Sequence, residues 1–167
     1  DRGINGPITI NGGMIEAVSL ESDANGEHGA AIGAGARSSG GSITISGGHV
    51  KVKGGESTAL IKGKDETIEG GFIQTEFSGG NPGPVFESTS FSTGKGQAVI
   101  TIDDTHITDL GGVISGSYDE TQLGCIISGT AFEGKYYGNK DITLTVPGTE
   151  VLTTAGDLHI PEGVTLH

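Results

Sequence analysis

Short runs of alternating apolar and polar residues recur along this chain, and a tight turn that often contains Gly-Gly interrupts each run. The unit reads ITINGGMIEA at 8–17, ITISGGHVKV at 43–52 and ETIEGGFIQT at 66–75. A period of two places every second side chain on one face of a strand, so Ile8, Ile10 and Ile15 are expected to share a face. One such pair of strands cannot bury its apolar face alone, whereas stacked pairs build a continuous core.

Looser copies of the unit follow, as ITIDDTHITD at 100–109, IISGTAFEG at 126–134, LTVPGTEVL at 144–152 and HIPEGVTL at 159–166. The residue before each turn is aliphatic, and the series is Ile10, Ile45, Ile68, Ile102, Ile127, Val146 and Ile160. Uneven intervals between these residues are typical of β-helix rungs that carry variable loops. Second apolar segments follow the loops and predict the opposite wall of the rungs; they lie at 29–35, 57–63, 83–88 and 111–116.

These patterns predict an all-β fold, a right-handed parallel β-helix (solenoid), with residues 1–167 forming one domain. The expected strands lie at 7–10, 14–18, 43–46, 49–53, 67–69, 72–76, 99–102, 106–109, 125–128, 142–146 and 150–152. An antiparallel sandwich is the alternative, and Asn11-Gly12 fits its hairpin turns. Similar turns after the same strand motif at 46, 69 and 103 favour stacking.

The amino-acid composition argues against several classes of binding partner. Of the 32 glycines, 14 form Gly-Gly pairs, and the recurrence of these pairs between β-branched runs indicates turns rather than disorder. The net charge is −12 and the nine basic residues are scattered, so we expect neither nucleic acid nor an anionic membrane surface as a partner. No stretch approaches the roughly 18 apolar residues of a membrane span, so no membrane insertion is expected. The single cysteine, Cys125, beside Ile126 and Ile127, is expected to be a buried thiol.

The sequences GPITINGGMIEAV and GAAIGAGARSSGGSITISGGHVKVKGG resemble repeats of secreted and wall-anchored bacterial surface proteins, in which ITINGG-type strand pairs alternate with GAGIGGG-type stretches. The resemblance covers residues 6–64 and extends more loosely over 65–135. The C-terminal ITLTVPGTEVLTTAGDLHIPEGVTLH is similar to the tapering repeats of the same proteins. The shared residues are turn glycines and core aliphatics, so no active site can be carried over.

This resemblance implies a secreted or cell-surface location and a non-catalytic β-helix module that acts as an adhesin or scaffold segment. Adjoining domains of the same chain are expected, and the partner would be a glycan or a host or cell-surface protein. A carbohydrate-binding module is the first alternative. A polysaccharide lyase or hydrolase of the β-helix type is the second, because paired carboxylates such as Asp103 with Asp104, or Asp119 with Glu120, could serve glycoside hydrolysis.

The candidate ligand site lies in two loops expected to leave consecutive rungs, 115–124 and 133–141, which hold all three tyrosines. Aromatic faces bordered by polar side chains suit sugars, because the ring stacks on C–H faces while polar groups bind hydroxyls. The residues predicted to bind are Tyr118, Asp119, Glu120, Tyr136, Tyr137 and Asn139. The alternative is that the tyrosines cap the end of the core.

Three further columns of side chains follow from the expected stacking of the turns. Glu69, Asp103 and Asp104 fall in one turn column and are weak candidates for a calcium site, while solvated acidic turns that discourage aggregation are the favoured interpretation. No other cofactor is expected. The position after the turn predicts a semi-apolar stripe of Met14, His49, Phe72, His106 and Ala131, open to a partner or covered by loops. The threonine column of Thr9, Thr44, Thr67 and Thr101 lacks the second column that ice binding requires.

Overall fold

The structure is a computed structural model that describes residues 6–19, 28–35, 37–54, 56–93, 97–132, 134–141, 143 and 157–167. Its strands are β1 (Ile8–Ile10), β2 (Met14–Val18), β3 (Ile32–Gly33), β4 (Ile43–Ile45), β5 (His49–Gly54), β6 (Ile61–Lys62), β7 (Asp65–Ile68), β8 (Gly70–Phe77), β9 (Phe86–Ser92), β10 (Gln97–Asp103), β11 (Ile114–Ser117), β12 (Cys125–Gly129) and β13 (Lys135–Tyr137). A four-residue helix, α1 (Leu110–Val113), and the 3₁₀ turn η1 (Glu120–Gln122) complete the described elements.

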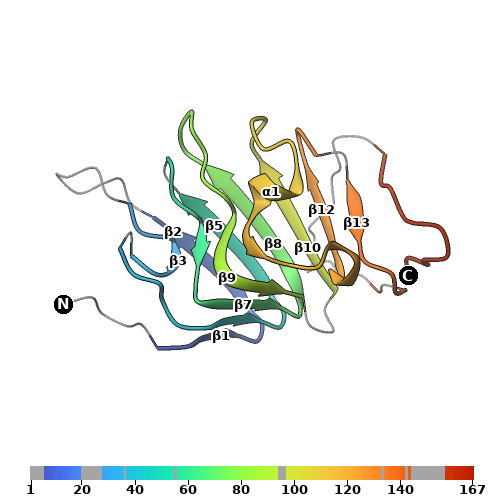
Figure 1. Cartoon of the computed structure of the whole chain (residues 1–167), viewed down its shortest axis with the longest axis horizontal. Coiled ribbons are helices and arrows are strands. Elements are labelled where there is room, and N and C mark those ends of the chain that lie inside the picture. Colours follow the sequence, from blue (N-terminus) through green and yellow to red (C-terminus); the bar gives the residue numbers. More distant parts are fainter. Residues whose placement is uncertain are drawn as a thin grey trace.

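The strands stack into two sheets, and the chain passes back and forth between them (Figure 1). The first sheet has the order β1-β4-β7-β9-β6-β3, with β11 beside β9, and the second has the order β2-β5-β8-β10-β12-β13. Every pairing of these strands is parallel except the last, between β12 and β13. The predicted parallel β-solenoid is therefore confirmed, with about three turns, and the antiparallel sandwich is wrong.

Aliphatic side chains line up from turn to turn inside the solenoid. One column of the second sheet runs in register through Ile15, Val50, Ile73, Ile100 and Ile127. The last four expose none of their surface, while Ile15, in the first turn, is half-buried. Because each aliphatic covers the one below it, the alternation seen in the sequence becomes a continuous core.

The Gly-Gly turns between β1 and β2, β4 and β5, and β7 and β8 also stack. Gly13, Gly48 and Gly71 have φ angles of 86°, 93° and 98°, in the left-handed region that side chains disfavour. A Cβ atom on Gly48 would lie 2.6 Å from the carbonyl oxygen of Gly13. Both the turn conformation and the close approach of neighbouring turns therefore require glycine at Gly48.

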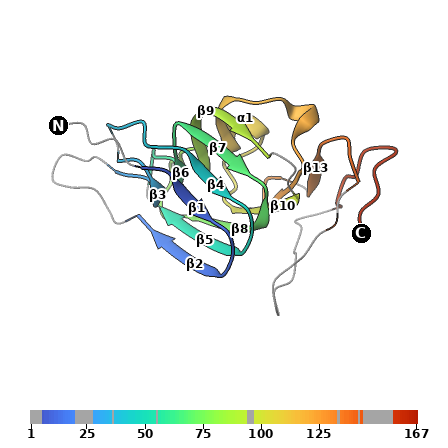
Figure 2. The ribbon, with the colours of Figure 1, turned by 90° about the horizontal axis from the view of Figure 1, so that it is seen from below.

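The second apolar segments form the opposite wall, as predicted, with β3, β6, β9 and β11. Strand β9 joins this wall to the rest of the first sheet, because Phe86 pairs with Ile61 of β6 while Phe91 pairs with Glu66 of β7 (Figure 2). In the preceding turn of the solenoid, the chain bends at Gly63 and Lys64, between β6 and β7. In the next turn, β9 passes the same corner as one uninterrupted strand.

The predicted register is wrong beyond residue 90. Ser92, and not Thr101, continues the column of Thr9, Thr44 and Thr67. Thr101 pairs with Gln74 in the second sheet, so Ile102 and Ile127 do not belong to the column of Ile45 and Ile68. The reason is that SFST at 90–93 reads as a polar strand, and the apolar ITI at 100–102 fits a place in either sheet equally well.

Two further predictions change with this register. Residues 106–109 are not a strand, since His106 lies in a turn and Asp109 caps α1. The predicted semi-apolar stripe instead runs through Met14, His49, Phe72, Val99 and Ile126, without His106 or Ala131. Only its first member is open, because Met14 is 75% exposed while the next four are buried. The predicted strands at 142–146 and 150–152 lie outside the described residues, apart from residue 143.

The C-terminal end carries a second, smaller core. Strand β13 runs antiparallel to β12, and His159 forms a parallel bridge with Lys135. Leu158, Ile160 and Val164 pack against Ile126 and Tyr136, apart from the main core. The repeat predicted that Ile160 extends the interior column of aliphatics. Instead, Ile160 covers the outer face of the second sheet.

Candidate functional site

The loops that follow the second sheet stack from one turn to the next and form one wall of a groove. The backbone N–H of Ser57 donates to the carbonyl of Asn81 at 2.8 Å, and the Asn81 amide donates to the Ser57 hydroxyl at 2.8 Å. The N–H of Gly80 donates to Glu56 Oε1 at 3.1 Å. These bonds hold the Gly-Pro-rich loop 79–84 against the loop below it.

Glycine at position 83 is required by the same stacking. A Cβ atom on Gly83 would lie 2.5 Å from the backbone of Thr58, so any other side chain would force the two loops apart. Ser57 itself has a φ angle of 59°, the one non-glycine residue with positive φ among those described. The wall is thus held by close backbone contacts together with the side-chain hydrogen bonds of Asn81 and Glu56.

The other wall comes from the next turn, in the segment between β10 and β11. Asp104 Oδ1 accepts hydrogen bonds from the backbone N–H of His106 at 2.6 Å and from its ring Nδ1 at 3.0 Å. Ile107 is buried in the main core and anchors the segment. Asp109 Oδ1 accepts from the N–H of Gly112 at 2.9 Å and so caps α1.

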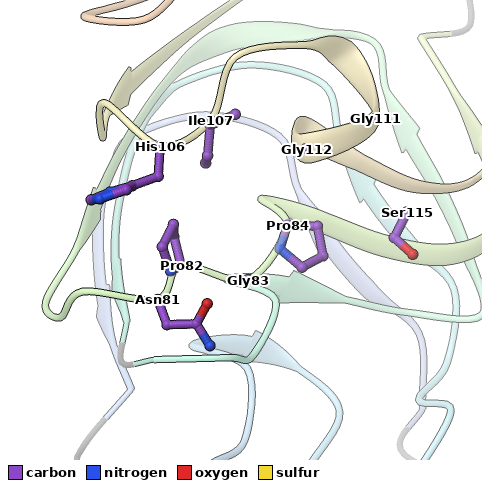
Figure 3. A pocket seen from close by; sticks show the side chains of 9 residues that line it. All are labelled: Asn81, Pro82, Gly83, Pro84, His106, Ile107, Gly111, Gly112 and Ser115. Carbon is purple, nitrogen blue, oxygen red and sulfur yellow. The ribbon is translucent and has the colours of Figure 1, made fainter.

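Between these walls lies a groove with a volume of about 410 Å³, lined by Asn81, Pro82, Gly83, Pro84, His106, Ile107, Gly111, Gly112 and Ser115 (Figure 3). The rings of Pro82 and Pro84 face Ile107 and the backbone of α1, which gives an apolar floor. The amide of Asn81, the imidazole of His106 and the hydroxyl of Ser115 provide polar groups around it. Such a groove offers hydrogen bonds and apolar contact with no carboxylate in its lining.

Sequence reasoning missed this groove, although it singled out His106 for a different reason. The available signal was the loop GGNPGP at 79–84, whose glycines and prolines interrupt the repeat. In the partner segment, residues 106–109 were predicted to form a strand. Since the groove needs both segments to lie on neighbouring turns, the wrong register concealed it.

The tyrosine loops do lie together, as expected, but they present little aromatic surface. Tyr136 and Tyr137 are buried, and the Tyr136 hydroxyl donates to the carbonyl of Lys140 at 2.8 Å. Burial raises the pKa of Tyr136 above its usual value and raises that of Tyr137 to about 12. Tyr118 is half-buried against the main core. Tyr137 packs in the main core and Tyr136 in the smaller core beside Ile126, so a sugar cannot stack on the faces of these two rings.

The polar members of the same predicted site are exposed. Lys135 Nζ lies 3.8 Å from Glu120 Oε1 and 4.6 Å from the centre of the Tyr137 ring, so it joins the two loops. Asp119 Oδ1 accepts hydrogen bonds from the N–H and hydroxyl of Thr121 at 3.0 and 2.8 Å, capping η1. Asn139 is exposed. Ligand binding by these residues stays a prediction, and it would rest on Glu120, Lys135 and Asn139.

The expected calcium column does not form. Asp103 pairs with Glu76 at the end of β8, whereas Glu69 precedes the start of that strand, so the two carboxylates lie at opposite ends of the second sheet. The Asp104 side chain is engaged with His106 instead. Within the described residues, no three His, Cys, Asp or Glu side chains are arranged to hold a metal ion. The wrong register caused this error as well.

Comparison with known proteins adds no identity, since no protein family, no curated protein and no solved structure matches the chain. In the part of the chain that the structure describes, no helix combines the length and the apolar character needed to cross a membrane.

Proposed function

We propose that this chain is a non-catalytic β-solenoid module of a secreted or surface-exposed bacterial protein, and that it acts as an adhesin segment. It would bind its partner through the groove lined by Asn81, Pro84 and His106. The observation that carries this proposal is the groove itself, with a volume of about 410 Å³ on the loop side of an otherwise regular stack. Cavities of roughly 300–1,000 Å³ are typical of ligand sites.

A rigid wall favours binding, because less conformational freedom is lost when a ligand is held. Both walls of this groove are held by hydrogen bonds, between Ser57 and Asn81 on one side and from Gly112 to the Asp109 side chain on the other. Loops displayed on a stable scaffold are the usual place for binding sites. The solenoid supplies that scaffold.

The regular outer faces are less suited to a ligand. On the second sheet, Lys53 pairs with Glu76 across neighbouring strands, and the first sheet shows a column of Thr and Ser hydroxyls. Exposed ion pairs and small side chains on a flat face offer little concavity. This favours the loop side as the place where the partner binds.

The roles of the acidic side chains support a non-catalytic module. Asp104 is engaged with His106, while Asp109 and Asp119 cap short helical turns. Glycoside hydrolysis typically uses two carboxylates that face a common substrate, and the groove lining contains none. Cys125 is buried, and burial raises its pKa to about 12, so it remains a thiol rather than a nucleophilic thiolate.

A carbohydrate-binding module is the second candidate, and the groove lining favours it. The amide of Asn81, the hydroxyl of Ser115 and the imidazole of His106 can bind sugar hydroxyls, while Pro82 and Pro84 can contact the apolar face of a ring. The net charge of −12 disfavours anionic polysaccharides, so a neutral glycan is the expected class.

The test is a glycan array and an array of extracellular proteins, each probed with the wild-type chain and two variants. His106→Ala with Ser115→Phe would remove a polar group and fill the groove; Asn139→Ala with Glu120→Gln is the matched control in the tyrosine loops. Loss of binding in the first variant alone supports the groove, and loss in the control alone moves the site to those loops. A wild-type chain that binds nothing on either array, or that releases products from polysaccharides, overturns the proposal.

A further inference from the structure

A carboxylate lies inside the solenoid at a place where the neighbouring turns have apolar side chains. Glu66 of β7 stands in register with Ile43 of β4 on one side and with Phe91 of β9 on the other. The exposed fraction is 1% for Glu66, 1% for Ile43 and 3% for Phe91. Within β7, Glu66 lies two residues before the buried Ile68, so both side chains point into the interior. The carboxyl of Glu66 therefore belongs to the core and not to the surface.

This carboxyl is poorly satisfied by the protein around it. Both Glu66 oxygens are buried, and neither has a donor in good hydrogen-bonding geometry. The nearest donors, the backbone of Gly63 and the hydroxyl of Ser88, lower the pKa of the carboxyl, but by less than burial raises it. An unpaired carboxylate in such surroundings is strongly disfavoured, whereas the protonated acid is neutral and can donate a hydrogen bond.

The charged groups around Glu66 do not relieve this cost. On β9, Glu87 adds a like charge, and its Oε1 is already paired with Lys62 Nζ of β6 at 2.8 Å. On β4, the facing residue is Ile43. On β7 itself, the neighbouring acid is the half-buried Asp65. The groups that act on the carboxyl thus include an acid and no cation.

We propose that Glu66 makes the stability of this module depend on pH: the protonated side chain fits the interior, and its ionisation weakens the corner where β6, β7 and β9 meet. The module is therefore most stable in acidic surroundings and loosens as the pH rises. This property belongs to the solenoid scaffold and holds whichever ligand the groove binds.

The direction of the pH effect on stability, and the pH range over which it occurs, follow from the protonation of Glu66. Burial, the largest cause, raises the pKa of Glu66 from 4.5 to about 8, while Gly63 and Ser88 act in the opposite direction. Between these two values the folded chain holds a proton that the unfolded chain has lost. The stabilisation is complete below pH 4.5 and is lost as the pH rises to about 8, by about tenfold in the folding equilibrium constant for each pH unit.

The experiment compares urea unfolding of the wild-type chain, Glu66→Gln and Glu87→Gln at intervals from pH 5 to pH 9. Glutamine keeps the size of the side chain and stays neutral, so Glu66→Gln should remove most of the fall in stability and be the more stable protein at pH 8. Glu87→Gln, at the half-buried acid of the same corner, removes only the smallest of the causes that act on the pKa of Glu66, so it should keep most of the wild-type slope. Equal slopes for the wild type and Glu66→Gln would overturn the proposal.

A second measurement does not depend on how the variants fold. The carboxyl carbon of Glu66 in the folded wild-type chain can be followed by NMR as the pH is raised. A midpoint near 8 supports the proposal, and a midpoint near the ordinary 4.5 of an exposed glutamate overturns it. This result is independent of the binding arrays, so the two proposals fail separately.

Discussion

Ile45 of β4 and Ile68 of β7 lie directly opposite each other in neighbouring turns, and neither exposes any of its surface. Replacing Ile45 by Ala would leave a cavity between the turns, so we expect a loss of about 2–5 kcal/mol in the free energy of unfolding. Thr44→Ala, on the outward side of the same strand, should cost far less. Denaturant melts of both variants test this, and equal losses would contradict the assigned inward and outward faces.

Gly48 should tolerate substitution much less than a glycine one turn away. Its φ of 93° and the 2.6 Å approach of a Cβ to the Gly13 carbonyl predict a loss of about 1–3 kcal/mol for Gly48→Ala. Gly12→Ala is the control, because a Cβ there meets nothing within 4 Å. Thermal unfolding compares the two; a Gly48→Ala variant as stable as Gly12→Ala would refute the stacked-turn argument.

Cys125 should be inert in the folded chain. Its side chain is buried in the main core and its pKa is raised to about 12, so almost no thiolate forms at pH 8. We expect no reaction with an aromatic disulfide reagent under native conditions and stoichiometric reaction in denaturant. Rapid labelling of the native chain would show that β12 is accessible.

The cap of α1 should matter both for stability and for the groove. Asp109→Ala removes the acceptor for the Gly112 N–H, and losing such a cap typically costs about 1 kcal/mol. Because Gly111 and Gly112 line the groove, their amide NMR signals should shift in this variant. Asp109→Asn retains a side-chain acceptor and should stay close to the wild type; similar shifts in both variants would mean that charge, and not the cap, holds α1.

In the repeat-rich half of the chain, the alternation of apolar and polar residues is enough to predict the strands. Strands β1, β2, β4 and β5 fall at their predicted places because ITI-GG-type units with outward Thr or Lys fit one arrangement of turn and wall. The groove could not be derived in the same way. It joins Asn81 and His106 from loops of different turns, and no local pattern encodes which loops become neighbours.

The tripeptide Ile-Thr-Ile shows that a local sequence does not specify its sheet, since it occurs in the first sheet at 43–45 and in the second at 100–102. The sequence by itself determined that this is a parallel stack of short strands, and which side chains of the repeat-rich strands point inward, because a period of two and the glycine turns are local properties. Only the tertiary structure decided which sheet each later strand joins, that Tyr136 and Tyr137 are buried, and which groups surround the Glu66 carboxyl. Those outcomes depend on register, which is set by how whole turns pack on one another.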